Sequence, residues 1–305
     1  RSKSGYYPHA IARTLKTNRS YNLGVLFQEK RGTGLTHSFF ASVLDAFKSA
    51  GEKRGYDITF INHHIGWTGM TYLEHCRYRN VDGVCVVCAD FYAPEVIELV
   101  DSNLPVVTID HSFNNRSCVL SDNIGGLKLL VDAAYQKGHR KIAYVHGEKS
   151  SVTENRIIGF YRAMQEHGLN VNPDFVVEAL YDNPATSMQA VLNLMNRPDP
   201  PTCILLPDDH STLGAMQAAK QLNLRVPEDL SLAGYDGIRL TQMLHPRLTT
   251  IEQDTKRIGA QAAEFLIDRI ENPRTAGSET ATIPVKLLEG ESMGICPVKA
   301  DAANS

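Results

Sequence analysis

The chain has 305 residues, of which 43% are hydrophobic and 21% are charged. This composition is typical of a globular protein with enough core for one large or two medium domains, and it excludes a disordered chain. No apolar run approaches the roughly 18 residues of a membrane span, and the first residues, Arg1 to Gly5, lack the hydrophobic segment of a signal peptide.

The net charge of −3 is unevenly distributed along the sequence. Residues 1–20 contain five basic residues and no acidic one, namely Arg1, Lys3, Arg13, Lys16 and Arg19. A basic end on an acidic body favours contact of that end with nucleic acid, and a solvated basic tail is the alternative.

Most of the six cysteines lie inside apolar runs, where cysteine behaves as a small hydrophobic residue. Cys85 and Cys88 have the spacing of a CxxC motif, but they fall in a strand-like run over 81–89. Residues i and i+3 of a strand face opposite sides, so we expect no metal site and no redox pair. Unpaired cysteines favour a reducing, cytoplasmic location.

The first predicted element is a short helix over 8–16, with Pro8 at the favourable first position. Ile11, Ala12 and Leu15 fall on one face of it. A helix this short is marginal by itself in water, and a polar linker over 17–20 follows it.

Strands then alternate with helices along the rest of the chain. The predicted strands cover 23–27, 56–61, 81–87, 105–109, 141–145, 175–179, 202–206 and 230–234, with shorter ones near 119, 250 and 282–285. The predicted helices cover 37–54, 68–79, 94–102, 123–137, 154–167, 185–196, 209–223 and 254–271. This alternation predicts an α/β protein with parallel sheets covered on both faces, arranged as two doubly wound halves.

Polar residues gather at the carboxyl ends of the predicted strands. They are Gln28, Asp110, Asp122, His146, Asp208, Asp209 and Asp236. Ligands of open α/β sheets bind outside these ends, so the set predicts a polar ligand pocket. Each residue taken singly could instead cap a helix or form a turn.

Three further residues are candidates for ligand contact. Arg156 is predicted in the first turn of a helix, where a cation opposes the helix dipole, so we expect a functional reason for it or an exposed head group. Phe39 and Phe40 open the first long helix. One can face the core, and the other can stack on a flat ligand or remain a half-exposed core residue.

Signals for catalysis are weak. The glycines of the segment 32–37 lack the third glycine of a dinucleotide-binding motif, and no GxSxG, HExxH or phosphate-binding loop occurs. Asp208 and Asp209 are adjacent, and adjacent carboxylates usually diverge. We therefore expect neither an enzyme nor a cofactor.

Five blocks of the sequence closely resemble the LacI/GalR family of bacterial transcription regulators, and the likeness extends from Gly5 to about Gly294. The most specific block runs from Arg225 to Ile251, with RVPEDLSLAGYDGI followed by HPRLTTI. The other four are GYYPHAIARTLK from Gly5, DNIGG from Asp122, GHRKI from Gly138 and RIIGF from Arg156.

The resemblance implies a periplasmic-binding-protein-like fold (type I) of two Rossmann-like subdomains joined by three crossovers, near Asp122, near 245–250 and near 280. We accordingly expect a hinge helix and linker at 1–20, an N-terminal subdomain of 21–121 with 250–279, a C-terminal subdomain of 122–249 with 280–296, and an unstructured tail at 297–305. The family binds its effector between the subdomains and forms homodimers.

The resemblance also implies roles for individual residues. Phe39 and Phe40 match ring-packing ligand contacts, and Asp122, Arg156 and Asp236 match polar ones. Asp208 is also expected at the ligand, although it stands where the family often has asparagine, which puts ordinary sugar recognition there in doubt.

The hinge helix implied by the resemblance contacts operator DNA. Leu15 matches a residue that wedges into a base step from the minor groove. Ala12 lies beside it, and Arg13 and Lys16 would meet phosphates or groove edges. The family's helix-turn-helix would precede Gly5, so we expect weak DNA binding by this sequence alone.

The sequence therefore predicts the effector-sensing and dimerisation region of a transcriptional regulator, with a sugar or sugar derivative as effector. The alternative is a periplasmic-type solute-binding protein of a transporter, which the basic start and the scattered cysteines disfavour. Nothing in the sequence supports an α/β enzyme.

Overall fold

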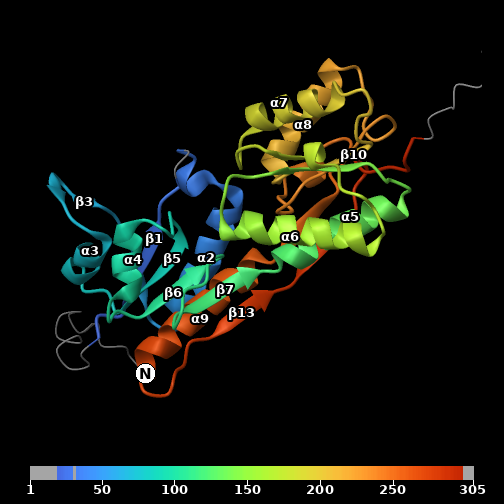
Figure 1. Ribbon diagram of the computed structural model, residues 1–305. Helices are drawn as coiled ribbons and strands as arrows, with labels where there is room; N and C mark the ends of the chain where they lie inside the picture. Colours follow the sequence, from blue (N-terminus) through green and yellow to red (C-terminus); the bar gives the residue numbers. More distant parts are fainter. Residues whose placement is uncertain (1–18, 30–31, 298–305) are drawn as a thin grey trace, which may run out of the picture. The chain divides into compact units, whose positions relative to one another are not determined.

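The computed structural model describes residues 19–29 and 32–297. The predicted hinge helix, with Ala12, Arg13, Leu15 and Lys16, and the tail after Pro297 lie outside these residues. The chain forms two compact units (Figure 1). Unit 1 comprises the described residues up to Leu120 together with Thr255–Ile283, and unit 2 comprises Ser121–Asp254 together with the described residues from Pro284.

Unit 1 is built on a six-stranded sheet with the order β13-β7-β6-β5-β1-β2. Its strands are β1 (Asn22–Phe27), β2 (Asp57–Ile61), β5 (Gly83–Cys88), β6 (Val106–Ile109), β7 (Ser117–Ser121) and β13 (Thr280–Ile283). Its helices are α2 (Ser38–Lys53), α3 (Tyr72–Tyr78), α4 (Pro94–Asp101) and α9 (Thr255–Glu271), with a single 3-10 turn at Gly34–Thr36. The pairing is parallel from β2 through β1, β5 and β6 to β7.

Successive side chains along a strand pack alternately into two separate cores, one on each face of this sheet. Cys85 packs in the core with Phe47 of α2 and Leu266 of α9, whereas Val86 packs in the core with Cys76 of α3 and Leu99 of α4. Strands buried on both faces explain the nearly continuous apolar runs of the sequence. Cys88 is half-buried and belongs to neither core, and the opposite orientation of Cys85 and Cys88 stays a prediction.

Unit 2 repeats this plan on a four-stranded parallel sheet with the order β11-β10-β8-β9. The strands are β8 (Ile142–His146), β9 (Val176–Glu178), β10 (Cys203–Leu205) and β11 (Ser231–Ala233). Helices α5 (Asn123–Gln136) and α6 (Ser151–Glu166) pack with one core, and α7 (Pro184–Met195) and α8 (Asp209–Gln221) with the other (Figure 1). Two 3-10 turns lie at Pro173–Phe175 and Thr241–Met243, and β12 (Thr250–Gln253) pairs antiparallel with β14 (Val285–Leu288).

The α/β class and the two doubly wound sheets are therefore confirmed. Two predicted helices were wrong at their starts: the helix expected over 154–167 begins at Ser151, and the helix expected over 68–79 begins only at Tyr72. A hairpin of β3 (His64–Ile65) and β4 (Thr68–Gly69) precedes it. The side chain of Thr71 caps α3 reciprocally with Glu74, which fixes where the helix begins.

Among the described residues, no helix is both long and apolar enough to cross a membrane.

Candidate functional site

The carboxyl ends of β8 and β10 mark the topological switch point of unit 2. The chain passes from β8 to β9 on one side of the sheet and then returns to β10 on the other side. Ligands of open α/β sheets bind at such points. Arg156 bonds the backbone just past the end of β10, at the carbonyl of Pro207.

Arg156 is a buried cation, 4% exposed, held from α6 by two defined hydrogen bonds. Its Nε donates to Asn123 Oδ1 at 2.7 Å, and its Nη1 donates to the Pro207 carbonyl at 2.8 Å. The guanidinium carbon lies 3.5 Å from the ring centroid of Tyr235, which is a close cation–π contact. Nη2 makes no hydrogen bond within the described part of the chain, so it is available to a ligand.

The position of Arg156 in its helix differs from the prediction. The helix begins at Ser151, capped by Ser150, and not at Glu154. Arg156 therefore lies in the second turn, where the helix dipole opposes a cation less. The helix dipole is therefore weaker evidence that Arg156 has a functional role. The stronger evidence is that its side chain is buried and is held in place by two hydrogen bonds.

Asp236 follows β11 in a strained backbone conformation, with φ of 110°. Such a φ is rare for a residue other than glycine and tends to occur at functional sites. Its Oδ1 accepts a hydrogen bond from Gln253 Nε2 at 2.7 Å. Burial raises the pKa of the Asp236 carboxyl well above its usual range, and the nearby charge of Arg156 counteracts part of that rise.

Two of the predicted carboxylates cap helices. Asp122 caps α5 by accepting a hydrogen bond from Gly125 N at 2.8 Å. Asp208 caps α8 and accepts hydrogen bonds from Ser211 N, Ser211 Oγ and Asp182 N at 2.7–2.9 Å. Capping was the alternative explanation for each of them, and a ligand contact by either residue stays a prediction.

Asp209 is fully buried and ties α8 to the segment after β11 and to β12. Its carboxylate accepts hydrogen bonds from Thr250 Oγ1 at 2.6 Å, Ile238 N at 2.8 Å and Thr241 Oγ1 at 3.1 Å. Burial raises the pKa of Asp209 to about 7, against the lowering effect of these three donors. The residue holds the carboxyl edge of unit 2 together.

Sequence reasoning missed a polar group that follows β9. Tyr181 Oη lies 2.8 Å from Thr153 Oγ1 on α6, and its ring centroid is 5.8 Å from the Arg156 guanidinium carbon. Asp182 bonds His210 in the first turn of α8. The signal was available, because the strand over 175–179 was predicted but the residues beyond its end were not considered.

Phe39 and Phe40 lie in unit 1. Phe39 is buried in the core shared by α2 and α9. Phe40 is half-buried, with its ring centroid 5.3 Å from that of Phe27 and 4.9 Å from that of His37. As expected, one ring faces the core, and Phe40 is the one left with accessible surface.

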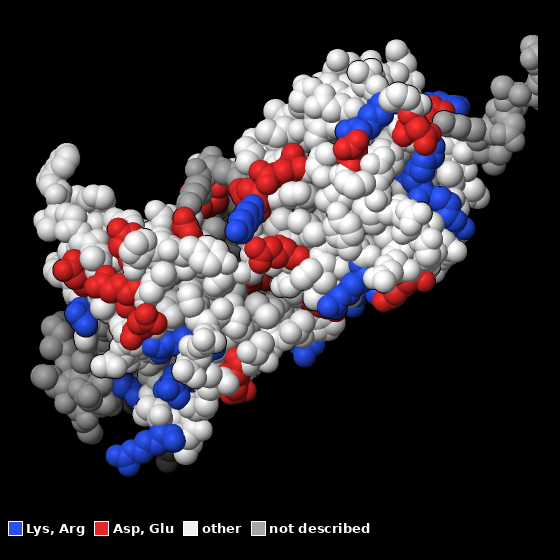
Figure 2. Space-filling model, viewed as in Figure 1, with Lys and Arg blue, Asp and Glu red and all other residues white. Residues whose placement is uncertain are grey.

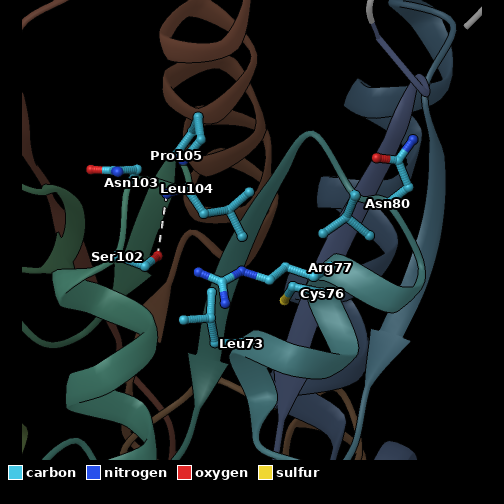
Figure 3. A pocket seen from close by; sticks show the side chains of 9 residues that line it. Leu73, Cys76, Arg77, Asn80, Ser102, Asn103, Leu104 and Pro105 are labelled. Atoms are coloured by element: carbon cyan, nitrogen blue, oxygen red, sulfur yellow. Dashed lines mark hydrogen bonds between the residues drawn. The ribbon is translucent and has the colours of Figure 1, made fainter.

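The described part of the chain also contains a cavity of about 340 Å³ in unit 1, away from all of these residues (Figure 3). It lies where α3 and α4 end, between Leu73 and Cys76 on one side and Ser102 and Leu104 on the other, and the side chain of Arg77 extends into it. These are the amino ends of β5 and β6, so the cavity is at the opposite edge of the sheet from a switch-point site.

The start of the described chain is fixed to unit 1. The carboxylate of Asp82 accepts hydrogen bonds from Ser20 N and Tyr21 N, both at 2.8 Å. Arg19 Nη2 donates to the carbonyl of Glu271, at the end of α9, at 3.1 Å. A segment entering at this point is thus anchored to the amino edge of the sheet of unit 1.

Comparison with known proteins gives consistent matches. Residues 131–293 match the periplasmic binding protein-like domain family. The chain is 30% identical to the HTH-type transcriptional repressor PurR of Proteus mirabilis, covering 96% of this chain and 85% of the relative. It is 33% identical to the ribose operon repressor of Haemophilus influenzae, covering 88% and 80%.

Solved structures share the fold. A LacI family transcriptional regulator from Enterococcus faecium, crystallised with bound ribose, superimposes with a TM-score of 0.76 at 23% identity, covering 90% of this chain and 99% of that one.

Proposed function

The chain belongs to the LacI/GalR family of transcriptional regulators, and from that premise we propose that the carboxyl edge of unit 2 binds its effector through Arg156 and Asp236. The chain is the ligand-sensing region of a repressor, not an enzyme and not the solute-binding protein of a transporter, since its relatives are transcriptional repressors. What we propose is which residues bind the effector, which class of molecule the effector is, and how the chains assemble.

One observation carries the proposal. A buried guanidinium, fixed at Nε and Nη1, keeps Nη2 available at the switch point. The strained residue Asp236 follows the neighbouring strand β11, near enough to interact with the charge of Arg156. Arginine and carboxylate together can donate to and accept from one hydroxylated ligand. The buried hydroxyl of Tyr144, near Arg156, has no hydrogen-bond partner among the described residues and is a further group that a ligand can satisfy.

The charge around Arg156 favours a neutral effector. Asp236, Asp208 and Asp209 all lie at the same edge of unit 2, and the carboxylate of Asp208 is already engaged by three donors. Burial and the charges of Asp208 and Asp209 already raise the pKa of Asp236, so further negative charge is unfavourable at this edge. A phosphate or carboxylate ligand would add such charge, whereas a sugar hydroxyl would not. A regulator of similar fold is crystallised with ribose, so a sugar or sugar derivative is the effector class that we propose.

A thermal-shift screen of sugars, sugar phosphates and nucleobases tests the proposal. A ligand at about 100 times its Kd should stabilise the protein by roughly 2.7 kcal/mol. Arg156→Ala and Asp236→Ala should each abolish the shift, with circular dichroism confirming that the variants fold. The matched controls are Arg225→Ala and Asp229→Ala, an ion pair before the amino end of β11 and so at the opposite edge of the sheet from Asp236, and both should keep the shift. A normal shift in both site variants would reject the site.

The wider assignments rest on the family. We propose that units 1 and 2 are its N-terminal and C-terminal subdomains, that the protein acts as a homodimer, and that Phe40 packs against the effector. We also propose that Ala12, Arg13, Leu15 and Lys16 contact operator DNA in the full-length regulator. Loss of operator binding by full-length Leu15→Ala, with effector binding unchanged, would support the last assignment, and retained operator binding would reject it.

A further inference from the structure

The cavity in unit 1 lies where the chain turns from α3 into β5 and from α4 into β6 (Figure 3). Hydrogen bonds within the two turns fix its walls. Val81 N donates to the carbonyl of Cys76 at 3.1 Å in the first turn, and Leu104 N donates to Ser102 Oγ at 3.2 Å in the second. The cavity is therefore formed by the folded chain itself, and its volume of about 340 Å³ falls in the range of small-molecule sites.

The lining of the cavity is apolar at its base and polar at its rim. Its apolar residues are Leu73, Cys76, Val81, Leu104 and Pro105. The polar residues are Arg77, Asn80, Ser102 and Asn103, and all of them except the half-buried Ser102 are exposed. An apolar surface with a few polar groups placed beside it is typical of sites that bind small organic molecules.

Arg77 is the one charged side chain in this lining. It comes from the last turn of α3 and extends into the cavity toward Ser102 (Figure 3). Within the described part of the chain its guanidinium makes no hydrogen bond and no ion pair. A cation in the last turn of a helix is favourable to the helix dipole, but that effect does not require the side chain to lie in a cavity.

The backbone carbonyls of the cavity walls are already engaged by other donors. The carbonyls of Ser102 and Leu104 both accept hydrogen bonds from the guanidinium of Arg116. The carbonyl of Pro105 accepts from Val84 N at 2.9 Å. The walls therefore leave the N–H groups of Arg77 without an acceptor, and a ligand that fits the cavity should supply one.

The charge at this edge of unit 1 also favours an anion. Burial and the positive charge of Arg269 lower the pKa of Arg116, and Asp101 counteracts part of that lowering. Arg269 lies in the last turn of α9. At this end of unit 1, which carries the N label in Figure 1, Figure 2 shows mainly Lys and Arg side chains. Added negative charge is favourable in such surroundings, and added positive charge is not.

We propose that the cavity is a second ligand site, which binds a small organic acid by its carboxylate at Arg77 and by its apolar chain at the base. The guanidinium of arginine matches the two oxygens of a carboxylate. The apolar residues of the lining stabilise a hydrocarbon chain by removing it from water. This site does not depend on the effector site proposed for unit 2, because it shares no residue with it.

The cavity adjoins the anchor that holds the start of the described chain. Val81 lines the cavity, and the next residue, Asp82, accepts hydrogen bonds from Ser20 N and Tyr21 N. An acid bound in the cavity thus lies beside the point where residues 1–18 join unit 1. Those residues contain four basic side chains and no acidic one, so repulsion by Arg77 disfavours them as occupants of the cavity.

Calorimetric titration of octanoate into the whole chain tests the proposal. Octanoate should bind, and along the series from butanoate to octanoate the affinity should rise about threefold to fourfold for each methylene. Two matched compounds separate the contributions of the two parts of the ligand. We expect 1-octanol, which keeps the chain and lacks the carboxylate, to bind at least about tenfold more weakly, and acetate, which lacks the chain, not to bind measurably.

Three variants locate the site. Arg77→Gln should weaken octanoate binding by at least about tenfold and leave 1-octanol binding unchanged. Arg79→Gln removes the same charge two residues further on, from a side chain outside the cavity lining, and should leave octanoate binding nearly unchanged. Arg156→Ala should also leave it unchanged, so that a failure of the effector site and a failure of this site are distinguishable.

Hydrogen exchange followed by mass spectrometry gives a second readout. Bound octanoate should slow amide exchange in peptides that cover 73–81 and 102–105. The proposal is overturned if octanoate does not bind the wild type, if Arg77→Gln binds it as well as the wild type does, or if Arg79→Gln weakens binding equally. Protection confined to unit 2 would overturn it as well.

Discussion

Replacing Asp209 by asparagine should remove a defined part of the pH dependence of stability. The folded pKa of Asp209 is raised to about 7 from an ordinary value of 3.8, so the folded state binds more protons than the unfolded state between these values. The stabilisation is fully present below the unfolded pKa and is lost as the pH rises through the folded one.

The size of the effect follows from the same two values. From pH 5 to pH 8 the contribution of Asp209 to the free energy of unfolding should fall by about 2–3 kcal/mol. The asparagine side chain would not titrate, and its amide can still accept from Ile238 N and Thr241 while donating to the hydroxyl of Thr250. The folded geometry should therefore survive the substitution.

The assay is urea unfolding of the wild type and Asp209→Asn at several pH values from 5 to 8. The difference in unfolding free energy, wild type minus variant, should fall by about 2–3 kcal/mol across this range. Asp229→Asn is the matched control, because the Asp229 pKa of about 2, lowered by its hydrogen bonds from Arg225, lies well below the range and gives a flat difference. A flat or rising difference for Asp209→Asn would refute the reasoning.

Three further substitutions test the packing and the helix capping of unit 1. Gly259→Ala should destabilise the protein by about 1–3 kcal/mol in thermal unfolding, because its Cβ would lie 2.2 Å from the carbonyl oxygen of Val43 on α2. Gly277→Ala, with no atom within 4 Å of the new Cβ, should leave stability nearly unchanged, and equal losses in the two would reject the packing argument. Thr71→Ala should cost about 1 kcal/mol by removing the cap of α3. An unchanged midpoint for that variant would mean that Glu74 N and the first turn find other partners.

Much of the fold could be predicted from periodicity alone. Strands buried on both faces, such as β5 and β6, appear in the sequence as continuous apolar runs, and the helices between them have apolar faces at regular spacing. The hairpin at His64–Gly69 could not be found in this way. Its strands are two residues long, and Thr68 and Gly69 continue into a helical pattern that only the cap at Thr71 interrupts.

The sequence predicted where the residues of the candidate site lie, but it did not predict what each of them does. The residues after strands β8, β10 and β11 were identified because a parallel sheet collects its strand ends at one edge. Whether a carboxylate caps a helix, as Asp208 does, or has a strained backbone, as Asp236 does, depends on neighbours that are distant in the sequence. Asn123 and the Pro207 carbonyl, which fix Arg156, have no sequence signal of that contact.

The central claim is that the guanidinium of Arg156 binds the effector. Its most direct test is a calorimetric titration of the best sugar from the screen into the wild type and into Arg156→Lys. Lysine keeps the charge but cannot hold Asn123 and Pro207 while also presenting a fixed donor. We predict an affinity at least about 100-fold weaker in the variant, and equal affinities in the two proteins would contradict the account.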